Sequence, residues 1–167
     1  MKIVFLIICF AITLACQTGK TALTADQEEQ LSHSLPPNVR EILEKSQKFS
    51  LLAGESRSAS QTALDFKPTH IARISDGAVK REVLENLYLD VAVKPVLAAC
   101  YDPHHGIRAE YNGQKVEIDI CFTCVRIVVR SPFGEFSGAM RLDDNSSKAL
   151  FERILKDKGV KIETETL

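Results

Sequence analysis

Three cysteines and two histidines gather in one stretch of the chain, between residues 100 and 124. They are Cys100, His104, His105, Cys121 and Cys124. Thiolate and imidazole are the preferred ligands of tetrahedral zinc sites, and a thiol beside an imidazole is the pair that a cysteine nucleophile uses. In an oxidising compartment the same thiols can instead form a disulfide. This stretch therefore holds the side chains that could carry chemistry.

A β-hairpin is predicted to position these side chains. The Asn-Gly pair at 112–113 lies between two alternating runs, which is the strongest short-range signal of a two-residue type I′ turn. In that register Arg108 faces Glu117 on the polar face, and His104 faces Cys121 on the same face. A slip of one residue would turn the apolar side chains into water, so the register is well specified.

The spacing of Cys121 and Cys124 admits two exclusive interpretations. In an extended chain their α-carbons lie about 10 Å apart, too far for a disulfide, and the two side chains point to opposite faces. If the chain bends between them, the sulfurs can converge and a metal or redox site stays open. We expect a bulge or bend near Thr123, because an unbroken strand over 115–130 would be unusually long.

The cluster therefore has four interpretations. The five residues could supply a zinc site, or Cys100 and Cys121 could form a disulfide, since both lie near the open end of the hairpin. The thiols could equally be small buried apolar side chains. Catalysis would pair His104 with Cys121, oriented by Asp102 or Asp119. The sequence has no nucleophile elbow, phosphate-binding loop or metalloprotease helix to support it.

The N-terminus has the pattern of an export signal. Residues 1–15 join one lysine to an apolar run that is too short to span a bilayer comfortably, as in a signal peptide. The end of this run, ITLAC over residues 12–16, resembles the box at which bacterial lipoproteins are cleaved and acylated, with Thr13 as a departure. We expect Cys16 to be acylated and to anchor the protein in the bacterial envelope, in the outer membrane or facing the periplasm. The alternative is ordinary cleavage nearby, with Cys16 a plain thiol.

The remaining chain is predicted to be one domain on a short tether. Residues 16–34 are polar and are expected to be a flexible tether, and residues 35–167 a single α+β domain. The net charge is −1, and loss of Lys2 with the signal peptide makes it −2. No clustered basic face of the kind that binds nucleic acid is evident. The pattern predicts an antiparallel meander with about three helices on one face, its strands being about 69–74, 105–111, 115–130 and 135–142.

Two motifs and the last helix resemble a known group of proteins. The pattern C-x-x-P-x-H-G-I over residues 100–107, I-C-F-x-C over 120–124 and the ALFERIL sequence of the last helix resemble a group of small secreted bacterial proteins of uncharacterised function. The resemblance covers roughly residues 50–160. An arginine often stands in that group where this chain has His104, which implies that His105 and the cysteines are the better ligand candidates. The resemblance implies no activity.

Together these observations favour a lipid-anchored envelope protein that works as a non-enzymatic binding or structural module. Its Cys/His cluster would then be structural, and its expected partner is the membrane that holds the anchor. The alternative is a thiol- or zinc-dependent periplasmic enzyme that uses Cys121, Cys124 and His105.

Overall fold

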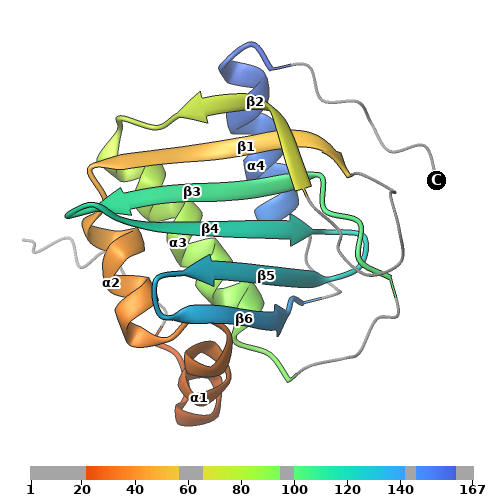
Figure 1. The fold of residues 1–167 in the computed structure, drawn as a ribbon. Coiled ribbons are helices and arrows are strands. Elements are labelled where there is room, and N and C mark those ends of the chain that lie inside the picture. The colour runs from red at the N-terminus through yellow and green to blue at the C-terminus, as the bar shows by residue number, and fades with distance from the viewer. Residues whose placement is uncertain (1–21, 57–65, 95–99, 142–145, 161–167) are drawn as a thin grey trace, which may run out of the picture.

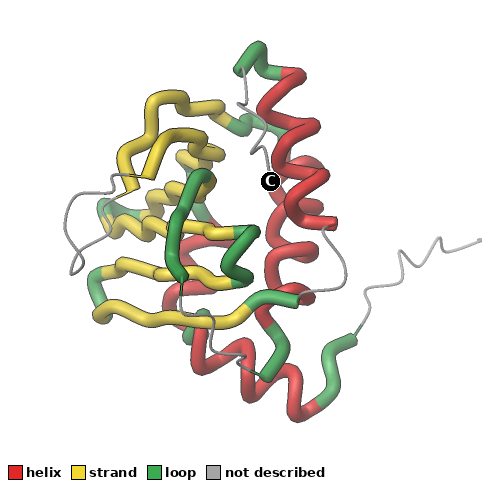
Figure 2. The backbone as a smooth tube through the Cα atoms, turned by 90° about the vertical axis from the view of Figure 1, so that its right-hand side faces the viewer, coloured by secondary structure: helices red, strands yellow, loops and turns green. Residues whose placement is uncertain are grey.

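A computed structural model describes residues 22–56, 66–94, 100–141 and 146–160. These residues form a six-stranded antiparallel sheet in the order β2-β1-β3-β4-β5-β6, with four helices (Figure 1). The strands form one layer and the helices the other, so one face of the sheet carries no described helix (Figure 2). The elements are α1 (Ala25–Ser34), α2 (Pro37–Lys45), β1 (Lys48–Ser56), β2 (Phe66–Arg73), α3 (Gly77–Val91), β3 (His105–Tyr111), β4 (Gln114–Cys121), β5 (Arg126–Ser131), β6 (Gly134–Ala139) and α4 (Ser146–Asp157).

The predicted α+β class and the central hairpin are confirmed. Asn112 has φ 50° and Gly113 has φ 77°, the positive angles that a type I′ turn requires. Arg108 pairs with Glu117 across the two strands, and the ladder runs from Tyr111 and Gln114 to His105 and Ile120. The alternation of the sequence therefore fixed both the turn and the register.

The run predicted as a strand over residues 115–130 is divided into two strands at the place where a bulge or bend was expected. β4 ends at Cys121, the chain turns through residues 122–125, and β5 returns antiparallel beside it. The turn contains Val125 at φ 48°, a conformation that a β-branched residue rarely adopts. The Val125 carbonyl accepts a hydrogen bond from the Met140 amide at 2.7 Å. Tertiary contacts, which the local sequence does not reveal, hold this turn in place.

Phe122 supplies the main apolar contact of this turn. Its ring packs edge-on against those of His105 and Phe151, with centroid separations of 5.1 and 5.6 Å. Phe151 is fully buried on α4. The turn therefore inserts an aromatic side chain between the sheet and a helix that follows it in the sequence, which offsets poor local turn propensity.

The predicted tether over residues 16–34 is wrong for its second half. Residues 25–34 form α1, which begins with a reciprocal capping box between Thr24 and Gln27. Leu31 is fully buried and Ser34 lies against Gly138 of β6. The T-x-x-Q cap was a readable signal in the sequence. The helix adds to the same folded unit as the sheet.

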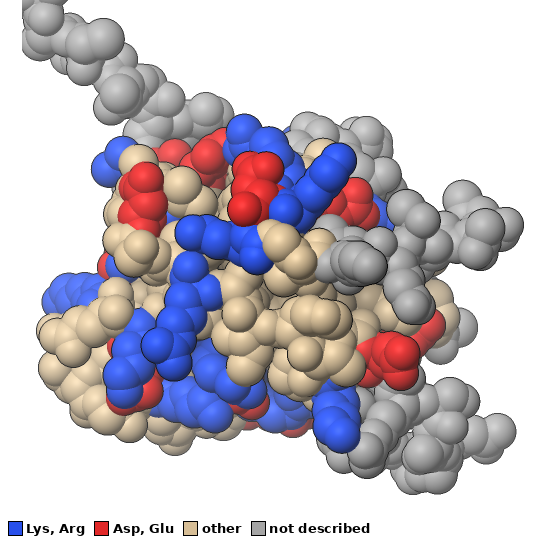
Figure 3. Space-filling view, turned by 90° about the horizontal axis from the view of Figure 1, so that it is seen from above, with Lys and Arg blue, Asp and Glu red and all other residues tan. Residues whose placement is uncertain are grey.

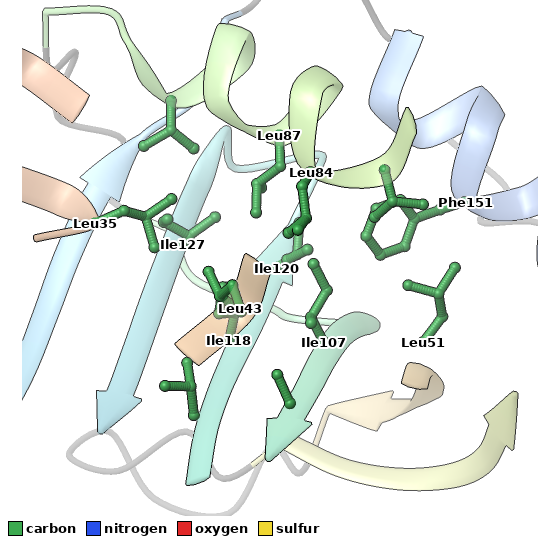
Figure 4. Close-up of a cluster of buried hydrophobic side chains, with 14 of the residues drawn as sticks. Leu35, Leu43, Leu51, Leu84, Leu87, Ile107, Ile118, Ile120, Ile127 and Phe151 are labelled. Carbon is green, nitrogen blue, oxygen red and sulfur yellow. The ribbon is translucent and has the colours of Figure 1, made fainter. Parts of the chain in front are cut away.

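The core lies between the sheet and the helices α2, α3 and α4. Leu84 and Leu87 reach down from α3 toward Ile120, and Phe151 enters the same layer from α4 (Figure 4). Leu87, Ile120 and Phe151 are fully buried. On β3, β4 and β5, every second side chain therefore points into the core. The side chains between them must point to the opposite face of the sheet.

We expect Gly138→Ala to destabilise the protein by roughly 1–3 kcal/mol, the usual cost of overpacking. A Cβ atom at this position would lie 2.5 Å from the Cβ of Ser34 and 3.3 Å from Cγ1 of Val91. The free energy of unfolding in urea, measured by circular dichroism, tests this. The matched control is Ser137→Ala, an exposed position on the other face of β6, which should change the stability by less than about 0.5 kcal/mol.

The double variant Gly138→Ala/Ser34→Gly should recover part of the lost stability, because it removes the atoms that the new Cβ meets. Equal stability of Gly138→Ala and the unaltered protein would show that α1 does not pack closely on β6.

Candidate functional site

The thiols of Cys121 and Cys124 converge. The turn after β4 lets the Cys124 amide donate a hydrogen bond to Sγ of Cys121 at 3.0 Å, and both side chains are buried. The interpretation with an extended chain through these residues is therefore wrong, and the interpretation with a bend is confirmed.

Cys100 joins them from the segment before β3. Its thiol makes a side-chain hydrogen bond with Cys124, and the backbone of Asp102 also bonds to Cys124. In space, therefore, the Cys124 residue lies between Cys100 and Cys121. Cys100 is exposed, whereas Cys121 and Cys124 are buried, and all three are free thiols. The sequence analysis paired Cys100 with Cys121, and the contact that the structure gives for the Cys100 thiol is with Cys124.

The environment of the thiols raises two of their pKa values. The hydrogen bond with Cys124 raises the pKa of Cys100, and burial raises the pKa of Cys124. A thiolate is the form that attacks substrates and binds metals, and catalytic cysteines have lowered pKa values. Cys100 and Cys124 are therefore less ready to ionise than ordinary cysteine thiols.

His105 lies on the core side of the sheet. It pairs with Ile120, which faces the core, and it is buried against the rings of Phe122 and Phe151. Successive side chains of a strand alternate between faces, so Cys121, the next residue after Ile120, points to the opposite face. The hairpin register therefore places His105 and Cys121 on opposite faces of the sheet, although the predicted zinc site includes both.

His104 lies just before β3. Its Nε2 atom lies 3.2 Å from Oδ2 of Asp102, and its carbonyl accepts a hydrogen bond from the Gly54 amide at 3.0 Å. The ladder of β3 and β4 ends at His105 and Ile120, so the predicted facing of His104 and Cys121 falls beyond the paired residues.

The structure does not assemble the predicted zinc site. Within the part of the chain that is described, no group of three His, Cys, Asp or Glu side chains is arranged to hold a metal ion. The alternation that places His105 in the core is one physical reason. Cys16, the predicted acylation site, lies outside the described residues.

A second feature is the face of the sheet that the described helices leave uncovered (Figure 2). One cross-strand row of side chains runs over all six strands of this face. In spatial order its members are Arg73, Ser50, Arg108, Glu117, Arg130 and Glu135. Only the pairing of Arg108 with Glu117 was predicted from the sequence, because the other pairings needed the order of the strands.

In the ion pairs of this face the cation is generally more exposed than its carboxylate. Arg130 lies 2.6 Å from Asp119, and the exposed fractions of their side chains are 39% and 4%. Lys48 lies 2.9 Å from Glu110, with fractions of 74% and 39%. In these two pairs the carboxylate therefore lies closer to the sheet, and the cation lies closer to solvent. Glu135, which is 69% exposed, departs from this pattern.

The segment before β3 connects the thiols to this face. The Tyr101 ring lies 5.3 Å from the guanidinium carbon of Arg126, on β5. Burial raises the pKa of Tyr101, and the Asp119 carboxylate adds to this shift. The segment therefore covers the end of the sheet at which the buried carboxylate lies.

Comparison of the chain with models of protein families, with curated proteins and with solved structures found no match in any of the three. The resemblance to small secreted bacterial proteins stays a prediction. No helix in the described residues is long and apolar enough to cross a membrane.

Glu117 is the charged group of this face whose effect on stability can be titrated. Burial raises the pKa of Glu117, but hydrogen bonds from Lys115 and Arg108 outweigh burial. The pKa of this carboxyl group is therefore lowered in the folded protein. A lowered pKa means that the carboxylate stabilises the folded state above its ordinary pKa and that this contribution is lost as the pH falls.

We therefore expect Glu117→Gln to lower the free energy of unfolding at pH 7 by about 1 kcal/mol. The gap between the two proteins should close as the pH falls below 4.5, the ordinary pKa of the side chain. Urea unfolding at a series of pH values measures it. Glu135→Gln, which removes a mostly exposed carboxylate 3.7 Å from Arg130, serves as the control and should show little change at any pH. A gap for Glu117→Gln that widens at acid pH would contradict the sign.

Proposed function

We propose that the protein is an exported bacterial lipoprotein of the cell envelope that works by binding and not by catalysis. Its lipid would be attached at Cys16, and the uncovered face of its sheet would lie on the anionic surface of phospholipid headgroups. The observation that carries this proposal is the cross-strand arrangement in which cations stand above their carboxylates.

Charge asymmetry supports an anionic partner. The whole chain has a net charge of −1, so a surface of cations is not a consequence of composition. The uncovered face nevertheless carries one cation on each of five neighbouring strands, from β2 to β5 in the order of the sheet. These cations are Arg73, Lys48, Arg108, Lys115 and Arg130. Lys and Arg side chains line the lower edge of Figure 3, the side of the molecule to which this face belongs.

An exposed apolar side chain favours a lipid surface over a soluble anion. Ile71 of β2 is 52% exposed and pairs with Leu52 on the uncovered face. Cations with an exposed apolar residue beside them are the composition of surfaces that rest at a membrane interface. Each cation close to anionic lipid contributes about 1 kcal/mol. An acyl anchor and such a surface together give a firmer attachment than either one.

The first test measures binding to lipid vesicles without the acyl chain. Residues 16–167 with Cys16→Ser should sediment with vesicles that contain phosphatidylglycerol and not with pure phosphatidylcholine, and salt should weaken the binding. The triple variant Lys48→Gln/Arg73→Gln/Lys115→Gln should bind about a hundredfold more weakly, since three contributions are lost. Exposed ion pairs contribute little to stability, so the variant should stay folded.

The matched control removes three exposed cations from the helix layer, as Arg81→Gln/Lys156→Gln/Lys158→Gln. This variant has the same net charge as the first and should lose less than about threefold in affinity, because its cations lie on α3, on α4 and just after α4, away from the sheet face. Equal losses in the two triple variants, or equal binding to both lipids, would contradict docking by the sheet face.

The second test concerns the anchor. In bacteria that make the full chain, we expect the mature protein to begin at Cys16, to carry the mass of attached acyl groups, and to stay in the membrane fraction in high salt. Cys16→Ala should release it from that fraction in high salt, since electrostatic docking is screened there. Mass spectrometry of the N-terminal peptide shows which residue is first and whether acyl groups are attached to it. An N-terminus at another residue, without acyl groups, would contradict the lipoprotein proposal and leave the test of the sheet face unaffected.

A further inference from the structure

Cys124 is the centre of the contacts between the turn after β4 and the segment before β3. Its thiol bonds to the thiol of Cys100 and to the backbone of Asp102. Its amide bonds to Sγ of Cys121 at 3.0 Å. Two stretches that lie more than twenty residues apart in the sequence therefore meet at one sulfur atom.

We infer that Cys100 and Cys124 form a disulfide in the exported protein and that Cys121 stays a buried thiol. This goes beyond the binding function proposed above and does not depend on which surface the protein binds. It also replaces the pair expected from the sequence, Cys100 with Cys121.

The choice of pair follows from contact and access. The Cys124 thiol makes side-chain hydrogen bonds with the thiols of both Cys100 and Cys121, and of these two only Cys100 is exposed. Cys121 is 1% exposed, and its sulfur accepts the Cys124 amide from inside the turn. An oxidant in solution can therefore reach Cys100 first, and the sulfur next to Cys100 is that of Cys124. A disulfide between Cys121 and Cys124 would need an oxidant to enter the buried turn.

The reaction is a thiol–disulfide exchange with an external disulfide, such as that of an oxidising enzyme of the envelope or oxidised glutathione. The Cys100 thiolate attacks one sulfur of the external disulfide and releases the other as a thiolate. The Cys124 thiol loses its proton to solvent and attacks the mixed disulfide at the sulfur of Cys100, which releases the second thiolate of the oxidant. Two protons and two electrons leave the protein, and the oxidant becomes a dithiol or two thiols.

The local hydrogen bonds fit this order of events. The bond from the Asp102 backbone favours the Cys124 thiolate and opposes the effect of burial on the pKa of that group. Burial raises the pKa of Cys124 and so makes its sulfur a poor leaving group, so the disulfide, once formed, should exchange slowly. The bond is thus suited to a structural role, not to the transfer of oxidising equivalents to other proteins.

A bond at this place would fix the segment before β3 on the sheet. The segment holds Tyr101 beside Arg126, and Gly54 bonds to the His104 carbonyl at its far end. The disulfide would close the near end. It would also enclose the whole β3–β4 hairpin in one covalent loop, which restricts the unfolded chain.

The experiment maps the bond directly in the protein purified from the envelope and, in parallel, in the protein oxidised with oxidised glutathione. Free thiols are blocked with iodoacetamide and the chain is digested with trypsin and chymotrypsin. Trypsin leaves Cys121 and Cys124 on one peptide, residues 116–126, and chymotrypsin cuts after Phe122 between them. We expect the peptide with Cys124 to be joined to the peptide with Cys100, and Cys121 to be alkylated only after denaturation.

Three single variants give a second readout. Addition of dithiothreitol should lower the melting temperature of the oxidised protein by about 5–15 °C. Cys121→Ser should keep this shift, whereas Cys100→Ser and Cys124→Ser should lose it. The peptide map needs no variant, so it decides the matter even if Cys124→Ser does not fold.

A bond between Cys121 and Cys124, a bond between Cys100 and Cys121, or three alkylated thiols after oxidation with glutathione would overturn the inference. A bond that forms with glutathione but is absent from the protein purified from the envelope would overturn it for the exported protein. That last result would also weaken the proposed export, which the mass of the N-terminal peptide tests separately.

Discussion

The alternation of side chains along β4 is the constraint on which the rest of the structure depends. Ile118 and Ile120 are fully buried in the core, so Asp119 and Cys121 must lie on the other face. This one strand thus assigns the carboxylate that holds Arg130 and the sulfur that receives the Cys124 amide to the same face. It also assigns His105, which pairs with Ile120, to the core. The charged face and the thiol cluster therefore share one origin.

The sequence predicted what local patterns determine and missed what distant contacts determine. The Asn-Gly turn and the register of Arg108 with Glu117 follow from alternation and turn chemistry, and the structure confirms both. The turn after Cys121 has no Gly, Pro, Asn or Asp, and it forms because Phe122 packs against Phe151, a residue of the last helix. No local pattern announces such a contact. The helix over residues 25–34 was missed for a different reason. Its capping box can be read from the sequence, but its apolar stripe is short and gives little helical periodicity.

The sequence predicted which residues belong to the candidate site better than it predicted how they are arranged. Three of the five residues, the cysteines, lie together in the structure. The contact of Cys100 with Cys124 could not be predicted, because it depends on how residues 100–104 lie against the turn after β4. The uncovered charged face could not be read from the sequence, because the row from Arg73 to Glu135 joins six strands whose order only the structure gives.

The turn after β4 can be tested most directly by nuclear Overhauser spectroscopy of the isotopically labelled protein. The account predicts contacts between the ring protons of Phe122 and Phe151, together with cross-strand backbone contacts that pair Cys121 with Arg126 and Glu117 with Arg130. A single strand that continues from Gln114 to Arg130, with sequential contacts through residues 121–126 and no cross-strand contacts, would contradict it. The thiol cluster and the charged face would then both lose their basis.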